Sequence, residues 1–177
     1  MTWRERMKRR LFRYWWRFKF GEPPSRFAIG SGGLRPQHLA LLLPPDFHDF
    51  DVAQRVLLPL VERMNPKHTT ILVRENFRTW LPTGQGWQIV TFDSTARGFL
   101  GFPKPDVLHK LEGLLPDVLV DLTPSFSAYT AALATGSGAP LRISLDVEQE
   151  GTFYNFFIEF DGSSTLAERY NALLRYV

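Results

Sequence analysis

The sequence predicts a three-layer α/β domain of the Rossmann or flavodoxin-like class, with a mostly parallel sheet between two layers of helices. Two observations predict it: short apolar runs alternate with amphipathic segments from His38 onward, and the connections between them are short. Such alternation favours right-handed βαβ crossovers and hence parallel strands. The length of 177 residues suits one domain of this kind with a short appendage.

Six runs of residues are expected to form strands. The first of them, HLALLL, is a continuous apolar run that ends at Pro44 and Pro45, as in a strand that is buried on both faces. The sixth is rich in aromatic residues, which favours a strand at the edge of the sheet or an antiparallel addition to it. The expected strands are residues 38–43, 69–74, 88–92, 117–122, 141–145 and 153–160.

Four helices are expected between and after these strands, at residues 51–64, 104–115, 124–135 and 165–176. Apolar residues at helical spacing predict the first of them, with Asp49 or Asp51 as its N-cap. Thr165 and Glu168 fit a capping box at the start of the last helix.

The charge of the chain is divided unevenly. Residues 1–22 hold eight Lys and Arg against two Glu, whereas the remainder holds 13 Lys and Arg against 16 Asp and Glu. We expect a basic amphipathic helix at residues 1–22, a linker at 23–37 and the α/β domain at 38–177. The leader residues expected to contact a membrane or a partner are Trp3, Arg6, Arg9, Arg10, Arg13, Trp15, Trp16 and Arg17.

Three interpretations of this leader stay open. Its aromatic and basic faces suit an anionic membrane surface, which would place the protein in the cytoplasm, peripherally on the inner face of the membrane. The apolar stripe also suits packing on the domain, on a partner protein or on a second copy in a homo-oligomer. Arginines with aromatics suit RNA as well, but the acidic remainder of the chain disfavours nucleic acid as a partner.

Several kinds of chemistry are excluded by composition and motifs. The chain has no cysteine, so thiolate nucleophiles, disulfides and Cys-based zinc sites are ruled out. It contains no GxGxxG or GxxxxGKS/T phosphate loop and no GxSxG nucleophile elbow, and its four histidines show no paired ligand spacing. We therefore expect neither a cofactor nor a resident metal. No apolar run reaches the roughly 20 residues of a membrane-spanning helix.

Polar residues gather where the first expected strand ends. Asp46, His48, Asp49 and Asp51 lie within six residues there. In a doubly wound sheet, ligands bind beyond the carboxyl ends of the strands, near the point where the strand order reverses. Carboxylates beside an imidazole suit a catalytic general base, or ligands for a divalent ion. The alternative is that an aspartate caps the following helix and that His48 is merely exposed.

A second polar group follows the fourth expected strand. Asp121, Thr123 and Ser125 would reach the same edge of the sheet, and Asp146 would join them from the end of the fifth strand. Hydroxyl groups at the start of a helix suit an anion or a phosphate. Caps and turns use the same residue types, so the alternative is a structural role.

Six segments in order resemble the first half of the ADP-heptose:lipopolysaccharide heptosyltransferases and their relatives in glycosyltransferase family 9. They are LALLLPP, DVAQRVLLPLVERMNP, HTTILVREN, WQIVTFD, PDVLVDLTP and SGAPLRISLD, between Leu39 and Asp146. The last segments of the chain resemble a small bacterial domain of unknown function. The resemblance implies a Rossmann-like fold in a bacterial protein, with Asp51 as the base on the acceptor hydroxyl, although Phe50 stands where the family has glycine.

The resemblance also implies that the nucleotide-sugar donor is held mainly by a second domain. We therefore expect a non-catalytic or partner-dependent glycosyltransferase-like domain at the cytoplasmic membrane surface, because half a cleft does little to orient or desolvate the reacting groups. The alternatives are a small sugar- or phosphate-handling enzyme acting as a homodimer, and an RNA- or ribosome-associated factor acting through the leader.

Overall fold

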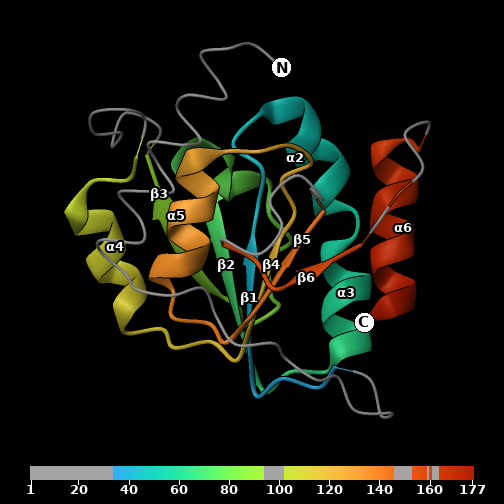
Figure 1. Cartoon of the computed structure of the whole chain (residues 1–177), viewed down its shortest axis with the longest axis horizontal. Coiled ribbons are helices and arrows are strands. Elements are labelled where there is room, and N and C mark those ends of the chain that lie inside the picture. The colour runs from blue at the N-terminus through green and yellow to red at the C-terminus, as the bar shows by residue number, and fades with distance from the viewer. Residues whose placement is uncertain (1–33, 94–101, 146–152, 159, 161–163) are drawn as a thin grey trace.

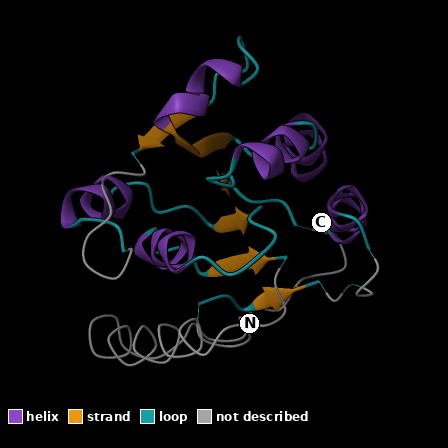
Figure 2. Cartoon of the chain, turned by 90° about the horizontal axis from the view of Figure 1, so that it is seen from above, coloured by secondary structure: helices purple, strands orange, loops and turns teal. Residues whose placement is uncertain are grey.

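The chain folds as a parallel sheet with helices on both faces (Figures 1 and 2). This computed structural model describes residues 34–93, 102–145, 153–158, 160 and 164–177. The predicted fold class is confirmed, and every strand pair among these residues is parallel. The leader helix expected at residues 1–22 lies outside the described residues, as does most of the expected linker.

The sheet runs in the order β3-β2-β1-β4-β5-β6. Successive strands build outward from β1 in one direction as far as β3, and then in the other direction from β4 to β6. The order therefore reverses between β1 and β4, where Leu42 pairs with Asp121. The strands are β1 His38–Leu42, β2 His68–Arg74, β3 Gln88–Phe92, β4 Val118–Asp121, β5 Leu141–Ser144 and β6 Phe156–Phe157.

The two faces of the sheet bury two separate apolar cores. Leu39, Leu41 and Leu43 pack towards α2, α3 and α6, whereas Ala40 and Leu42 pack towards α4 and α5. Side chains alternate between the faces of a strand, so a strand buried on both sides is apolar at nearly every position. The helices are α2 Phe47–Gln54, α3 Leu57–Met64, α4 Pro105–Glu112, α5 Ala128–Gly136 and α6 Leu166–Tyr176.

The single helix predicted at residues 51–64 is wrong, because two helices occupy this stretch. The carboxylate of Asp46 accepts a hydrogen bond from the backbone N–H of His48, so Asp46 is the N-cap and α2 begins before Asp49 and Asp51. Pro59 explains the break between α2 and α3. Its ring has no N–H to donate to the carbonyl of Arg55 and would clash with that carbonyl in a continuous helix.

Three further elements differ from prediction. The third helix begins at Ala128 and not at residue 124, because the hydroxyl of Ser127 accepts the N–H of Thr130 and caps it there. The sixth strand is an edge strand, as predicted, but it is short and parallel to β5, so the antiparallel alternative is wrong. A 3₁₀ helix, η1 Glu75–Trp80, follows β2 and was not predicted.

The last helix starts as predicted. Thr165 accepts from the N–H of Glu168, and the carboxylate of Glu168 accepts from the N–H of Thr165, which completes the capping box.

No helix among the described residues is long and apolar enough to cross a membrane.

Candidate functional site

The loops that follow β1 and β4 lie next to each other at the carboxyl edge of the sheet. The parallel pairing of β1 with β4 brings them together, and α2 stands above the strand ends (Figure 1). This is the reversal point at which doubly wound domains bind ligands. Both loops were expected at one edge of the sheet, and the parallel pairing of β1 with β4 places them there.

The first loop presents three of its polar side chains near solvent. Asp46 and His48 are exposed, and Asp49 is half-buried in the first turn of α2. Burial raises the pKa of Asp49, and the nearby Asp46 raises it further, whereas His48 lowers it. A carboxyl group whose pKa is raised in this way suits a general base, so Asp49 is the best-placed acid–base candidate of this loop.

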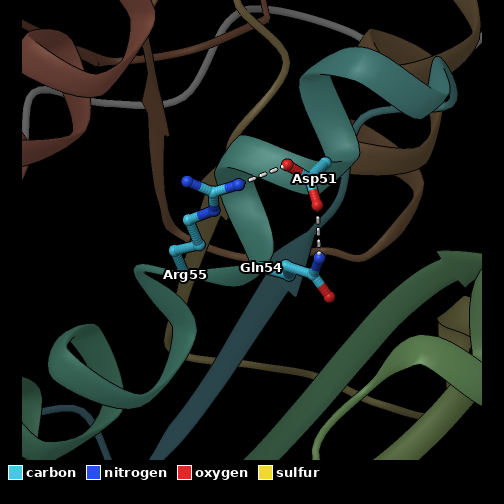
Figure 3. A network of polar contacts seen from close by, with 3 residues as sticks. All are labelled: Asp51, Gln54 and Arg55. Carbon is cyan, nitrogen blue, oxygen red and sulfur yellow. Dashed lines mark hydrogen bonds and ion pairs between the residues drawn. The ribbon is translucent and has the colours of Figure 1, made fainter.

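Asp51 is held within α2 itself. Its carboxylate accepts a hydrogen bond from the side-chain amide of Gln54 at 2.9 Å and one from the guanidinium of Arg55 at 2.6 Å (Figure 3). These partners lie three and four residues further along the chain, the spacing at which helix side chains meet. The side chain of Asp51 is 39% exposed and that of Arg55 71%, so the pair lies on the helix surface. To act as a general base, the carboxylate of Asp51 would first have to break its ion pair with Arg55.

Asp121 ends β4 beneath α5 and is 1% exposed. The phenolic O–H of Tyr154 and the backbone N–H of Thr123 donate to its carboxylate. Burial raises the pKa of Asp121, and the bonds from Tyr154 and Thr123 oppose that rise. The pKa of Tyr154 is raised well above its usual value by burial and by the charge of Asp121. Neither side chain of this pair is exposed to solvent at the edge of the sheet.

Arg142 of β5 is another buried polar group on this side of the sheet, with 4% of its surface exposed. Burial lowers its pKa to about 10, while the neighbouring Tyr154 acts in the opposite direction. Within the described part of the chain, its Nε makes no hydrogen bond. A buried cation is costly unless it is paired, so the guanidinium of Arg142 depends on the partners of its other nitrogens.

Tyr170 of α6 contacts the chain directly after β4 from the other face of the sheet. The hydroxyl of Tyr170 donates to the carbonyl oxygen of Leu122 at 2.6 Å, and the side chain is fully buried. Its pKa is raised first by burial, then by Asp49 and Asp121. The hydroxyl of Tyr170 therefore lies directly after β4 and within electrostatic reach of Asp49 and Asp121.

Sequence reasoning missed Tyr154 and Tyr170. A tyrosine that is buried needs a partner for its hydroxyl, so a tyrosine inside an aromatic run, or on the apolar stripe of a helix, is a signal for a buried acceptor. That signal does not name the acceptor, because the contacts join residues far apart in the sequence: Tyr154 with Asp121, and Tyr170 with Leu122.

The other predicted residues are placed as follows. Thr123 is buried and Ser125 is exposed, whereas Asp146 lies outside the described residues. No group of three His, Asp or Glu side chains that could hold a metal ion occurs within the described ranges. The leader residues Trp3, Arg6, Arg9, Arg10, Arg13, Trp15, Trp16 and Arg17 also lie outside those ranges.

Two solved structures share this arrangement of strands and helices. One is the heptosyltransferase WaaC of E. coli with ADP, at 13% identity and a TM-score of 0.56 over 77% of this chain and 45% of that one. The other is a glycosyl transferase family 9 structure from Veillonella parvula, at 14% identity and a TM-score of 0.60 over 85% of this chain and 43% of that one. The chain has a glycosyltransferase-like fold.

This likeness confirms the resemblance inferred from the sequence at the level of the fold. The chain spans less than half the length of each of these glycosyltransferase structures. No protein-family model matches the sequence, and no curated protein sequence matches it either.

Proposed function

We propose that this chain is a glycosyltransferase-like domain that transfers no sugar by itself and works with a partner or in a non-catalytic role. One observation carries the proposal. Of the carboxylates at the two strand ends, Asp46 caps α2, Asp51 is paired with Arg55, and Asp121 is buried against Tyr154. Acid–base catalysis needs a group that is free to take a proton from the substrate. These three are engaged within the chain, and Asp49 is the one carboxylate of these loops that makes no hydrogen bond among the described residues.

The lengths of the matched structures support the proposal that this chain works with a partner. The matched structures are more than twice as long as the region they share with this chain, and one of them contains ADP. Transferring a sugar from a nucleotide requires that donor and acceptor be held together and shielded from water. In this chain the hydroxyl of Tyr170 donates to the carbonyl oxygen of Leu122, directly after β4.

Nucleotide binding tests this proposal. Titration of the purified chain with ADP, followed by calorimetry and by backbone amide shifts in α2 and in the loop after β4, is expected to show no saturable binding. Saturable micromolar binding with shifts at Asp49 and Thr123 would refute it, because the domain would then hold a donor nucleotide without a partner.

A second candidate function is a small sugar- or phosphate-handling enzyme that acts as a homodimer, and Asp49 favours it. This carboxyl group is half-buried, makes no hydrogen bond among the described residues and has a raised pKa. A homodimer enzyme predicts activity that rises with protein concentration and is lost in Asp49→Asn. Asp106→Asn, at an exposed site in the first turn of α4, is the matched control.

We propose further that residues 1–22 hold the protein at the cytoplasmic surface of a membrane. Eight basic residues support this, since each contributes roughly 1 kcal/mol near an anionic surface. The full chain should sediment with phosphatidylglycerol vesicles but not with phosphatidylcholine vesicles, and a chain lacking residues 1–22 should remain in solution. Unchanged sedimentation of the shortened chain, or binding of the leader to RNA in place of vesicles, would overturn it.

A further inference from the structure

The crossover from β2 to β3 lacks the α-helix that usually covers such a connection. Parallel strands are commonly joined through a helix packed on the sheet. Here only η1 and a glycine-containing loop join the two strands. Ile89 of the edge strand β3 pairs with Ile71, whose side chain belongs to the core under α3, so Ile89 faces the same side. Because no helix covers it, Ile89 remains 36% exposed.

A pocket of about 350 Å³ lies in the space that such a helix would fill. Its apolar wall comes from Leu81, Pro82, Trp87 and Ile89, and Arg78 and Gln85 supply polar groups. The volume falls in the lower part of the range for small-molecule sites, roughly 300–1,000 Å³, and an apolar wall with a few polar groups is the usual lining of such sites. We call this the flank pocket, because it lies beside β3 and away from the reversal point.

Two glycines give the loop around the flank pocket its shape. Gly84 and Gly86 have φ angles of 80° and 68°, a region that side-chain-bearing residues rarely adopt. A Cβ at either position would meet nothing within 4 Å. The backbone conformation therefore requires these glycines, and packing does not. The positive φ angles of these two glycines therefore set the path of the loop beside the pocket.

Two long polar side chains line the flank pocket at its exposed side. Arg78 and Gln85 are exposed, and neither side chain has a hydrogen-bond or ion-pair partner among the described residues. Trp87 is half-buried, with one part packed against the core under α3 and the remainder available to the pocket. The pocket thus combines an indole ring, an amide and a guanidinium group.

This combination matches the chemistry of a sugar ring. A pyranose has an apolar face of C–H groups, which packs on an aromatic ring, and a rim of hydroxyl groups, which hydrogen-bond to amide and guanidinium groups. A nucleobase is apolar on both faces and gains most when it is covered on both. The flank pocket is open to solvent and offers a single aromatic ring, which favours the sugar.

We propose that the flank pocket is a secondary saccharide-binding site, in which one sugar ring packs on Trp87 and places hydroxyl groups against Gln85 and Arg78. The choice of a saccharide rests on the glycosyltransferase-like character of the proposed function. The site itself is separate from the reversal point, so it would anchor a saccharide away from the strand ends that carry Asp49 and Asp121.

Titration of the full-length chain with methyl α-D-glucopyranoside, methyl β-D-galactopyranoside and maltose tests the site. The readout is the shift of the Trp87 indole N–H signal in ¹H–¹⁵N spectra, assigned with Trp87→Phe. Because the pocket is shallow and open, we expect a dissociation constant on the order of millimolar. Loss of one hydrogen bond in Gln85→Ala or Arg78→Ala should weaken binding about three- to tenfold.

Matched controls separate a pocket from general surface binding. Trp80→Ala removes an exposed tryptophan that does not line the pocket, and Arg175→Ala removes an exposed arginine of α6. Both should leave the affinity unchanged. The proposal is overturned if none of the three saccharides shifts the Trp87 signal, if Gln85→Ala and Arg78→Ala bind as well as the natural chain, or if adenosine binds in their place.

The outcome is independent of the ADP titration. Saccharide binding at Trp87 can fail while the chain still binds no nucleotide, which refutes the flank site and leaves partner dependence standing. Saturable ADP binding together with a saccharide-dependent shift of the Trp87 signal would refute partner dependence and leave the flank site standing.

Discussion

Replacing Tyr154 with phenylalanine removes one hydroxyl group from the buried polar pair and leaves the packing nearly unchanged. Tyr154 is fully buried, Asp121 is 1% exposed, and the phenolic O–H donates to the carboxylate. A hydrogen bond to a charged group contributes about 1.5–3 kcal/mol to stability. A loss of about 2 kcal/mol in a domain of this size lowers Tm by about 4–8 °C.

The loss should depend on pH in a defined direction. Burial raises the folded-state pKa of Asp121 above its value in the unfolded chain, so folding favours the protonated carboxyl group and stability falls as pH rises through the folded pKa. The bond from Tyr154 acts on the ionised form and opposes this fall. Its contribution is therefore complete above the folded pKa of Asp121 and shrinks as pH drops below it.

Urea unfolding of the natural chain and of Tyr154→Phe, at neutral pH and at about pH 4, measures both effects. Tyr176→Phe is the matched control, because Tyr176 is 63% exposed and its loss should cost less than about 0.5 kcal/mol. A Tyr154→Phe cost that is below about 0.5 kcal/mol, or that grows as the pH is lowered, would refute the reasoning.

Three further changes probe other parts of the fold. Thr165→Ala breaks the capping box of α6 and should cost about 1 kcal/mol in urea unfolding. Leu60→Ala removes a fully buried side chain of α3 and should cost about 2–5 kcal/mol in the same measurement. Asp49→Asn should raise Tm at neutral pH, because burial and Asp46 disfavour the charged carboxylate in the folded state.

Each of these changes has its own check. Thr79→Ala is the control for Thr165→Ala, because Thr79 is an exposed threonine of η1 and its replacement should leave stability unchanged. An equal loss of stability in both variants would mean that Thr165 does not stabilise α6 as a cap. Leu115→Ala, at a leucine that is 70% exposed, should cost far less than Leu60→Ala. The gain in Asp49→Asn should vanish below the unfolded pKa of aspartate, and a gain that persists in acid would have another cause.

The sequence predicts the sheet well because burial on both faces favours apolar residues at nearly every position. His38–Leu42 and Val118–Asp121 are such runs, and their alternation with helices implies parallel pairing. The helix boundaries were harder. Asp46, and not the predicted Asp49 or Asp51, caps α2, and the helix predicted at residues 51–64 ran across Pro59, which a continuous helix does not tolerate.

The candidate site was predictable only in part. Parallel topology alone brings Asp49 and Asp121 to neighbouring loops, so their proximity follows from the order of the elements. The partners of these carboxylates do not follow from it. Tyr154 reaches Asp121 from a segment 33 residues away, and Arg55 reaches Asp51 across one helical turn. The pairing of Asp51 with Arg55 follows from helix spacing, whereas the contact of Asp121 with Tyr154 joins distant segments and does not follow from the sequence pattern.

The most direct measurement is the rate at which the purified chain, alone and kept monomeric, releases ADP from ADP-heptose in the presence of a saccharide acceptor. We predict a rate equal to that of buffer, because Asp46, Asp51 and Asp121 are already engaged within the chain and the chain spans less than half of each matched structure. Sustained turnover at about 1 s⁻¹ or faster, abolished in Asp49→Asn, would contradict this account.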